Sequence, residues 1–146
     1  MIHILVVDDD KNLNQTVCTY LNDCGFEAKG VLSANEAYDE MYNNLYELII
    51  SDIMMPEMRG DELCKELKNN IETSHIPVIL LTALNNEKDI LSGLKIGADE
   101  YILKPFNIGI LKATVDNLLT NRALLRSKYA NLELDDEEED DECINC

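Results

Sequence analysis

Short apolar runs alternate with segments of helical periodicity along most of the chain, and this alternation limits the folds that the chain can adopt. The apolar runs cover residues 4–7, 48–51, 78–81 and 101–103, with a weaker run at 27–31. Between the runs, apolar residues recur three or four positions apart, as in Leu63, Leu67 and Ile71. Strands that alternate with amphipathic helices form βαβ units around a parallel sheet. We therefore predict an α/β fold with five βα units in series.

The length of the chain fits one domain with a helical extension and a charged tail. Its 146 residues match the ~100 to 200 residues of a typical domain, and we assign residues 1–121 to this domain. A last helical pattern runs from about Ile108 to Tyr129, so residues 122–132 are expected to project as a connector or as a dimer seam, with a connector favoured. Residues 133–146 are mostly acidic, and we expect this tail to be disordered.

The charge balance and the hydrophobic pattern exclude several classes of function. The chain has 12 Lys plus Arg and 29 Asp plus Glu, which gives a net charge of −17. Such a chain repels phosphate backbones, so we expect no direct nucleic-acid binding by this segment. The longest apolar stretch, residues 76–81, is far shorter than the ~20 residues of a membrane helix, and the amino terminus lacks a secretory signal. We expect a cytoplasmic protein that makes no membrane contact.

The five cysteines are an odd number with irregular spacing, which argues against a disulfide framework. Cys143 and Cys146 have the spacing of half a zinc site, but no second paired motif accompanies them. We therefore interpret the cysteines as ordinary free thiols.

Polar residues follow the predicted strands at the sheet edge where ligands bind in open parallel sheets. These residues are Asp8, Asp9, Asp10, Asp52, Thr82 and Lys104. If the first and third strands are neighbours, Asp8, Asp9 and Asp52 converge, and carboxylates that close repel one another unless a cation intervenes. Hard oxygen ligands on short loops suit Mg²⁺ with several retained waters. The sequence therefore predicts a magnesium site at this edge.

Metal, hydroxyl and ammonium around one carboxylate are the groups that stabilise a phosphoryl group during transfer. Asp52 is the predicted nucleophile, because carboxylates form aspartyl phosphates, and Lys104 either neutralises a carboxylate or binds a phosphate oxygen. Each residue alone has an ordinary structural interpretation. Asp10 is expected to cap the first helix, a lone Asp at a strand end is usually a turn residue, and Lys104 before Pro105 marks a strand exit. The joint pattern favours phosphoryl transfer.

At these residues the sequence resembles the receiver domain of two-component response regulators, over almost all of residues 1–130. The matching motifs are Val6-Val7-Asp8-Asp9, Ser51-Asp52-Ile53-Met54-Met55-Pro56 with Gly60 after it, Leu81-Thr82-Ala83, Gly97-Ala98-Asp99 and Lys104-Pro105-Phe106. The resemblance implies a flavodoxin-like, doubly wound five-stranded sheet of strand order 2-1-3-4-5, and it identifies residues 1–121 as the receiver domain. It also implies a cis bond between Lys104 and Pro105.

The resemblance implies that Asp52 accepts a phosphoryl group from a phosphohistidine of a histidine kinase or a phosphotransfer domain. Mg²⁺ would be held by Asp9, Asp52 and the Met54 carbonyl, with Asp8 acting through water. The isolated chain would not be a conventional enzyme, because it would carry out only Mg²⁺-dependent self-phosphorylation and autodephosphorylation.

Thr82 and Lys104 would contact the phosphoryl oxygens, according to the same resemblance. Thr82 would then move toward the phosphate and Tyr101 would turn inward, which remodels the face made by the fourth helix, the fifth strand and the fifth helix. The charge added at Asp52 would thus shift the equilibrium between two packing arrangements of this distant face. That shift would control an output.

Segments 73–83 and 117–122 resemble, more narrowly, the receivers of hybrid sensor histidine kinases of Bacteroidetes, which often continue into an AraC-type DNA-binding domain that regulates transcription. One interpretation is that the chain is a module of such a larger protein. Thr114 stands where winged-helix regulators have the Arg of their paired salt bridges, so their dimer mode is not assumed. Whether the chain forms a homodimer through another interface is left open.

A phosphatase resembling the haloacid dehalogenase superfamily is the alternative, because Asp8-x-Asp10, Thr82 and Lys104 imitate its motif order. It would use Asp8 as the nucleophile and leave Asp52 without a role, so we favour the receiver. A pseudo-receiver that binds partners without phosphorylation is disfavoured, since all the matched site residues are present.

Two apolar residues predict a long-lived phosphoaspartate. Met54 and Leu84 lie two residues after Asp52 and Thr82, where polar side chains would orient an attacking water. Neither Met54 nor Leu84 offers a hydrogen bond for that purpose.

Overall fold

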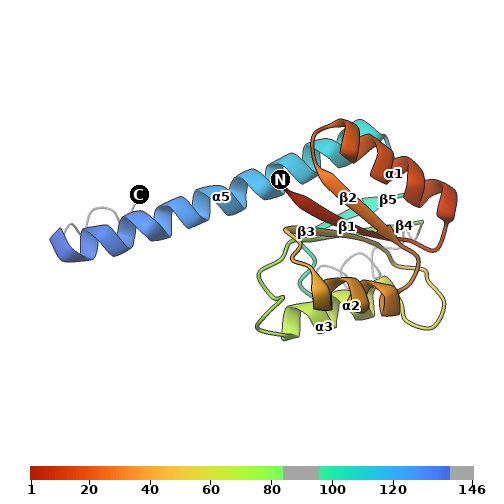
Figure 1. Ribbon diagram of the computed structural model, residues 1–146, viewed down its shortest axis with the longest axis horizontal. Helices are drawn as coiled ribbons and strands as arrows, with labels where there is room; N and C mark the ends of the chain where they lie inside the picture. Colours follow the sequence, from red (N-terminus) through yellow and green to blue (C-terminus); the bar gives the residue numbers. More distant parts are fainter. Residues whose placement is uncertain (84–95, 139–146) are drawn as a thin grey trace.

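The computed structural model describes residues 1–83 and 96–138, which form a five-stranded parallel sheet with helices on both faces (Figure 1). The strands are β1 (His3–Val7), β2 (Glu27–Val31), β3 (Leu48–Asp52), β4 (Val78–Thr82) and β5 (Glu100–Leu103). Their order in the sheet is β2-β1-β3-β4-β5, and all neighbours are parallel. The predicted α/β class and the implied flavodoxin-like order are confirmed.

The helices of the described part of the chain are α1 (Lys11–Asp23), α2 (Ala34–Asn43), α3 (Gly60–Asn69) and α5 (Ile108–Glu138). The helix predicted around Ile90, Leu91 and Leu94 lies outside the described residues, and the fourth helix of the implied switch face lies there with it. Within the described ranges, no helix has the length and apolar character to cross a membrane.

Side chains of the central strands point alternately into two apolar cores, one on each face of the sheet. Leu5, Ile49 and Leu80 pack with α2 and α3, and their strand neighbours face α1 and α5. Every residue of β3 and β4 is buried, as expected for strands that are covered on both faces. Figure 1 shows the two layers, with α2 and α3 on one side of the sheet and α1 and α5 on the other.

The starts of α1 and α2 are both capped by side chains, and the cap of α1 by Asp10 was predicted. The Asp10 carboxylate accepts hydrogen bonds from the backbone N–H groups of Asn12 and Leu13, at 3.1 and 3.2 Å. Ser33 Oγ accepts from the N–H of Glu36 at 3.2 Å. These bonds satisfy N–H groups that have no partner within the helix, and they fix the first turn of α1 directly after Asp8 and Asp9.

The α5 helix is longer than predicted. Leu111 and Val115 are fully buried against the sheet, and the helix then projects beyond it (Figure 1). It continues past the expected end at Tyr129 to Glu138, so residues 133–138 are helical where we expected disorder. Glu and Leu are strong helix formers, and this propensity favours continuation of the helix. The rest of the predicted tail, with Cys143 and Cys146, lies outside the described residues.

Cys18, Cys24 and Cys64 are free thiols, as predicted. Burial raises the pKa of the Cys18 and Cys64 thiols to about 11. Neither of these two is therefore ionised at neutral pH.

Candidate functional site

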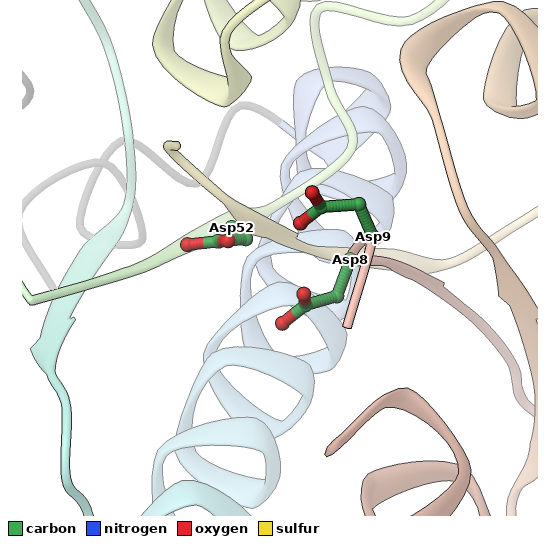
Figure 2. Close-up of side chains that lie close together, drawn as sticks. All are labelled: Asp8, Asp9 and Asp52. Carbon is green, nitrogen blue, oxygen red and sulfur yellow. The ribbon is translucent and has the colours of Figure 1, made fainter. Parts of the chain in front are cut away.

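Three carboxylates meet at the carboxyl ends of β1 and β3. Asp8 and Asp9 directly follow β1, and Asp52 is the last residue of β3. Oxygen atoms of the three carboxylates lie within 4.8 Å of one another, and Figure 2 shows the three side chains side by side. Asp8 is 1% and Asp52 6% exposed, whereas Asp9 faces the solvent. Because β1 and β3 are neighbours in the sheet, the acids converge as the sequence indicated.

Lys104 lies between the two buried acids. Its Nζ atom is 3.2 Å from Oδ2 of Asp8 and 3.3 Å from Oδ1 of Asp52. The residue follows β5 and is joined to Pro105 by a cis peptide bond, which confirms what the resemblance implied. Its backbone N–H donates to the carbonyl of Thr82 at 2.7 Å. The ammonium therefore reaches from the edge strand β5 to the centre of the sheet.

Burial and charge together raise the pKa of Asp52 above its ordinary value. Desolvation is the largest cause, and the neighbouring Asp8 carboxylate adds to it. The Lys104 ammonium and a hydrogen bond from the backbone N–H of Met54 act in the opposite direction without cancelling the rise.

The donor set suits a magnesium ion. The cluster consists of three carboxylates, and Mg²⁺ is bound by one or two carboxylates with several waters retained. The exposed side of Asp9 leaves room for these waters. A cation beside Asp52 and Asp8 would also relieve the repulsion by Asp8, which adds to the rise in the pKa of Asp52 that burial causes. The residues therefore fit the metal that the sequence predicted.

Thr82 and Tyr101 lie on adjacent strands, β4 and β5. Thr82 is the last residue of β4 and is fully buried, at the same edge of the sheet as Asp52. Tyr101 is half-buried and packs against the core formed with α2 and α3. These positions are compatible with the implied switch, and the movement itself stays a prediction.

Met54 lies on the loop after β3 with its side chain 53% exposed. Its backbone N–H contacts the Asp52 carboxylate, so the loop follows the site closely. The role of its carbonyl as a metal ligand stays a prediction. Leu84, the second residue expected to govern the lifetime of a phosphoaspartate, lies outside the described residues.

Asn14 is a positioning residue that the sequence analysis missed. It is 5% exposed, and its Nδ2 donates to the carbonyls of Val6, Asp8 and Val31 at 3.4, 3.0 and 2.8 Å. Gly30 makes room for it, because a Cβ there would lie 1.9 Å from Asn14 Oδ1. The amide therefore ties the loop that carries Asp8 to β1 and β2. Its position was a usable signal, since Asn14 is a polar residue within the apolar helical stripe that includes Val17.

The geometry argues against the phosphatase alternative. Lys104 is shared between Asp8 and Asp52, and Asp52 lies within the acid cluster. The alternative leaves this buried carboxylate without a function, although its burial is unfavourable.

Sequence comparison places these residues in a known family. The family model described as "Response regulator receiver domain" matches residues 4–116. The chain is 42% identical over 131 residues to "Histidine kinase P4" of Formosa agariphila, with 88% of this chain and 9% of that protein covered. It is 34% identical over 128 residues to "Regulatory protein VanRB" of Enterococcus faecalis, with 88% and 57% covered. The chain thus spans less than two thirds of the length of each of these relatives.

Solved structures give the same result. A signal receiver domain of a signal transduction histidine kinase from Syntrophus aciditrophicus has a TM-score of 0.78 and 36% identity, with 83% of this chain and 92% of that chain covered. The "BeF3 Activated DrrB Receiver Domain" has a TM-score of 0.75 and 34% identity, with 82% and 98% covered. The chain therefore belongs to the response regulator receiver domains, the phosphoacceptor domains of two-component signalling systems.

Proposed function

We propose that Asp52 accepts the phosphoryl group from a phosphohistidine, with Mg²⁺ bound beside it. The observation that supports this most is the setting of Asp52, a buried carboxylate 3.3 Å from the Lys104 ammonium and within 4.8 Å of two further acids. A carboxylate oxygen of Asp52 attacks phosphorus, so that the new O–P bond forms as the N–P bond to the donor imidazole breaks. The imidazole leaves with the electron pair of the broken bond.

Asp9, Asp52 and the Met54 carbonyl would hold the metal, with Asp8 acting through a water. When bound there, Mg²⁺ would neutralise negative charge on the transferring oxygens. Asp8 has a second role, because its Oδ2 keeps Lys104 at the site.

Lys104 and Thr82 bind the phosphoryl oxygens in this proposal. The Lys104 ammonium exchanges its contact with Asp52 for a phosphoryl oxygen and keeps its contact with Asp8. The Thr82 hydroxyl donates to a second phosphoryl oxygen, and Tyr101 then turns further inward. This change alters the face that includes β5 and the first part of α5.

The partner that delivers the phosphoryl group is a histidine kinase or a phosphotransfer domain, acting in the cytoplasm. The similarity to "Histidine kinase P4" supports a parent protein that is itself a hybrid histidine kinase. An AraC-type DNA-binding domain in the same polypeptide is the output that we propose. The acidic surface of this segment leaves DNA contact to that output domain.

A labelling experiment tests the proposed function. The chain is incubated with Mg²⁺ and a small acyl phosphate, and incorporated phosphate is located by mass spectrometry after hydroxylamine treatment. We expect one hydroxylamine-labile phosphate per chain on Asp52, none in Asp52→Asn, and normal labelling in Asp39→Asn, which removes an exposed acid from α2. Label on Asp8 with many turnovers would favour the phosphatase instead.

A further inference from the structure

Ser51 is a buried polar residue of β3 that has no part in the chemistry described so far. It is 1% exposed. Its neighbours two positions away, Ile49 and Ile53, belong to the apolar core formed with α2 and α3. Burial of a hydroxyl in such surroundings costs free energy unless a hydrogen bond within the protein replaces the one lost to water. The partner of this hydroxyl therefore indicates what Ser51 does.

The Ser51 hydroxyl donates a hydrogen bond to the backbone carbonyl of Asp52. Its Oγ atom lies 3.0 Å from the carbonyl oxygen. The pairing of β3 with β1 ends at Ser51 and Val7, one residue before Asp52. The hydroxyl thus binds the backbone at the point where pairing with β1 stops and the chain enters the loop beside the acid cluster.

The peptide group between Asp52 and Ile53 is held at both of its polar atoms. Its carbonyl accepts from Ser51, and its N–H donates to the carbonyl of Leu81 in β4 at 2.9 Å. The next N–H along the chain, that of Met54, donates to the Asp52 carboxylate. A rotation of the first peptide group would therefore displace the Met54 N–H, and the Met54 carbonyl with it.

The start of α3 encloses the Ser51 hydroxyl. A Cβ atom at Gly60 would lie 2.8 Å from Ser51 Oγ. The N–H of Gly60 donates to the carbonyl of Ile53 at 2.9 Å, so the helix start is itself bound to the same loop. The hydroxyl therefore lies between β3 and the first residue of α3, which restricts its rotation away from the Asp52 carbonyl.

We propose that Ser51 is a positioning residue for magnesium binding, because its hydroxyl fixes the peptide group after Asp52 and, through it, the backbone of Met54. The inference rests on the proposed function, in which the Met54 carbonyl is a metal ligand. Ser51 touches neither the metal nor the phosphoryl group. It holds the loop in the binding conformation before the metal arrives, so its loss lowers the affinity for Mg²⁺ and is compensated when Mg²⁺ is saturating.

Three measurements on Ser51→Ala, which removes only the hydroxyl, test the inference. The affinity for Mg²⁺, determined by titration calorimetry without a phosphate donor, should fall about tenfold, as is typical when a residue that supports a metal ligand is replaced. In the metal-free protein, the Met54 N–H should exchange with solvent about fivefold faster, the effect of one lost hydrogen bond. Labelling of Asp52 by an acyl phosphate at saturating Mg²⁺ should stay within about twofold of the wild-type rate.

Thr73→Val is the matched control. The Thr73 hydroxyl also donates to a backbone carbonyl, that of Leu67, at 2.7 Å. Thr73 precedes β4 and thus lies at the amino ends of the strands, whereas the acid cluster lies at their carboxyl ends. The control should lose about as much stability in urea as Ser51→Ala, because each variant lacks one hydroxyl hydrogen bond. Its affinity for Mg²⁺ and its Met54 exchange should equal those of the wild type.

The outcomes separate the inference from the proposed function. An unchanged affinity for Mg²⁺ or an unchanged Met54 exchange in Ser51→Ala, with the expected loss of stability, would show that the hydroxyl has only a structural role and overturns the inference. An equal loss of affinity in Thr73→Val also overturns it. A wild-type chain that takes up no label on Asp52 overturns the proposed function instead.

Discussion

The backbone of Gly60 lies directly against the backbone carbonyl of Asp52, so that a Cβ atom at position 60 would be 1.9 Å from this oxygen. The same Cβ would lie 2.8 Å from Ser51 Oγ. The Gly60 N–H also donates to the carbonyl of Ile53 at 2.9 Å. Since α3 begins at Gly60, the start of this helix is packed against the strand end that presents Asp52.

We predict that Gly60→Ala damages both stability and phosphorylation. The added methyl group meets backbone atoms that cannot move without displacing Asp52 or α3, so we expect a loss of about 2 to 3 kcal/mol in the free energy of unfolding. Phosphorylation by an acyl phosphate should slow about tenfold or more, because small misplacements of reacting groups are costly. Urea unfolding and labelling rates measure the two effects. In Gly109→Ala the new Cβ meets only the flexible Asn107 side chain, and wild-type behaviour is expected.

Replacement of Asn14 should loosen the loop that carries Asp8. Asn14→Ala leaves three backbone carbonyls without their shared donor, and we expect a cost of about 2 to 3 kcal/mol in the free energy of unfolding. Magnesium affinity, measured by titration calorimetry, should fall as well, because Asp8 and Asp9 lose their support. Gln15→Ala on the exposed side of α1 is the control and should change neither quantity. An unchanged magnesium affinity in Asn14→Ala would contradict a positioning role.

The raised pKa of Asp52 predicts a specific pH dependence of stability in the absence of metal. Between the ordinary Asp pKa and the raised value, the folded protein binds more protons at this site than the unfolded chain. Its contribution to the free energy of unfolding therefore decreases as pH rises through this window. Asp52→Asn removes the buried charge, so the variant should melt at a higher temperature than the wild type at neutral pH.

Calorimetry in a chelator over a pH series measures this difference. The advantage of Asp52→Asn should shrink as the pH is lowered toward the ordinary Asp pKa, because the wild-type carboxyl is then protonated. Added Mg²⁺ should stabilise the wild type more than the variant. A variant that melts lower than the wild type at neutral pH without metal would show that Asp52 is not an unfavourable buried charge.

A long-lived phosphoaspartate is expected, because the side chains at positions 54 and 84 cannot orient an attacking water. Met54→Asn combined with Leu84→Glu should accelerate the loss of phosphate at least about tenfold, since a positioned polar group contributes that much or more to proton transfer. Decay of the labelled protein after removal of the donor measures the rate. Asp39→Asn, which changes an exposed residue of α2, is the control and should leave the decay rate unchanged.

The acidic end of the chain should be dispensable for the chemistry. A chain that ends at Leu132 keeps every residue of the acid cluster and of both cores. We expect labelling of Asp52 at the wild-type rate and a free energy of unfolding of the isolated domain within about 0.5 kcal/mol. Slower labelling of the shortened chain would assign the acidic residues a part in phosphorylation.

The sequence predicts the sheet and the acid cluster well, because both follow from short-range patterns. Asp8, Asp52, Thr82 and Lys104 each stand directly after an apolar run, and a parallel sheet brings all such positions to one edge. The order of the strands cannot be derived from short sequence patterns. That the first and third strands are neighbours in the sheet was implied by the family resemblance. The cis bond at Lys104 came from the same source.

The contacts that support the site could not be predicted in the same way. Gly60 matters because of a close approach to Asp52 across a turn, and the sequence shows only that a glycine is present. Asn14 interrupts the apolar stripe of the first helix, which signals a special role, but the three carbonyls to which its amide donates are brought together only by the fold. The end of α5 was misjudged because helix propensity and like-charge repulsion oppose each other in residues 133–138, and the sequence alone does not show which is larger.

Lys104 joins two strands that are not neighbours. It follows β5 at the edge of the sheet, and its ammonium contacts Asp8 after β1, beyond the ends of β3 and β4. In the proposed function a phosphoryl oxygen binds this amine, and the residue that carries it is followed directly by Pro105 and, from Ile108, by α5. One side chain thus links the acid cluster at the centre of the sheet to its edge strand.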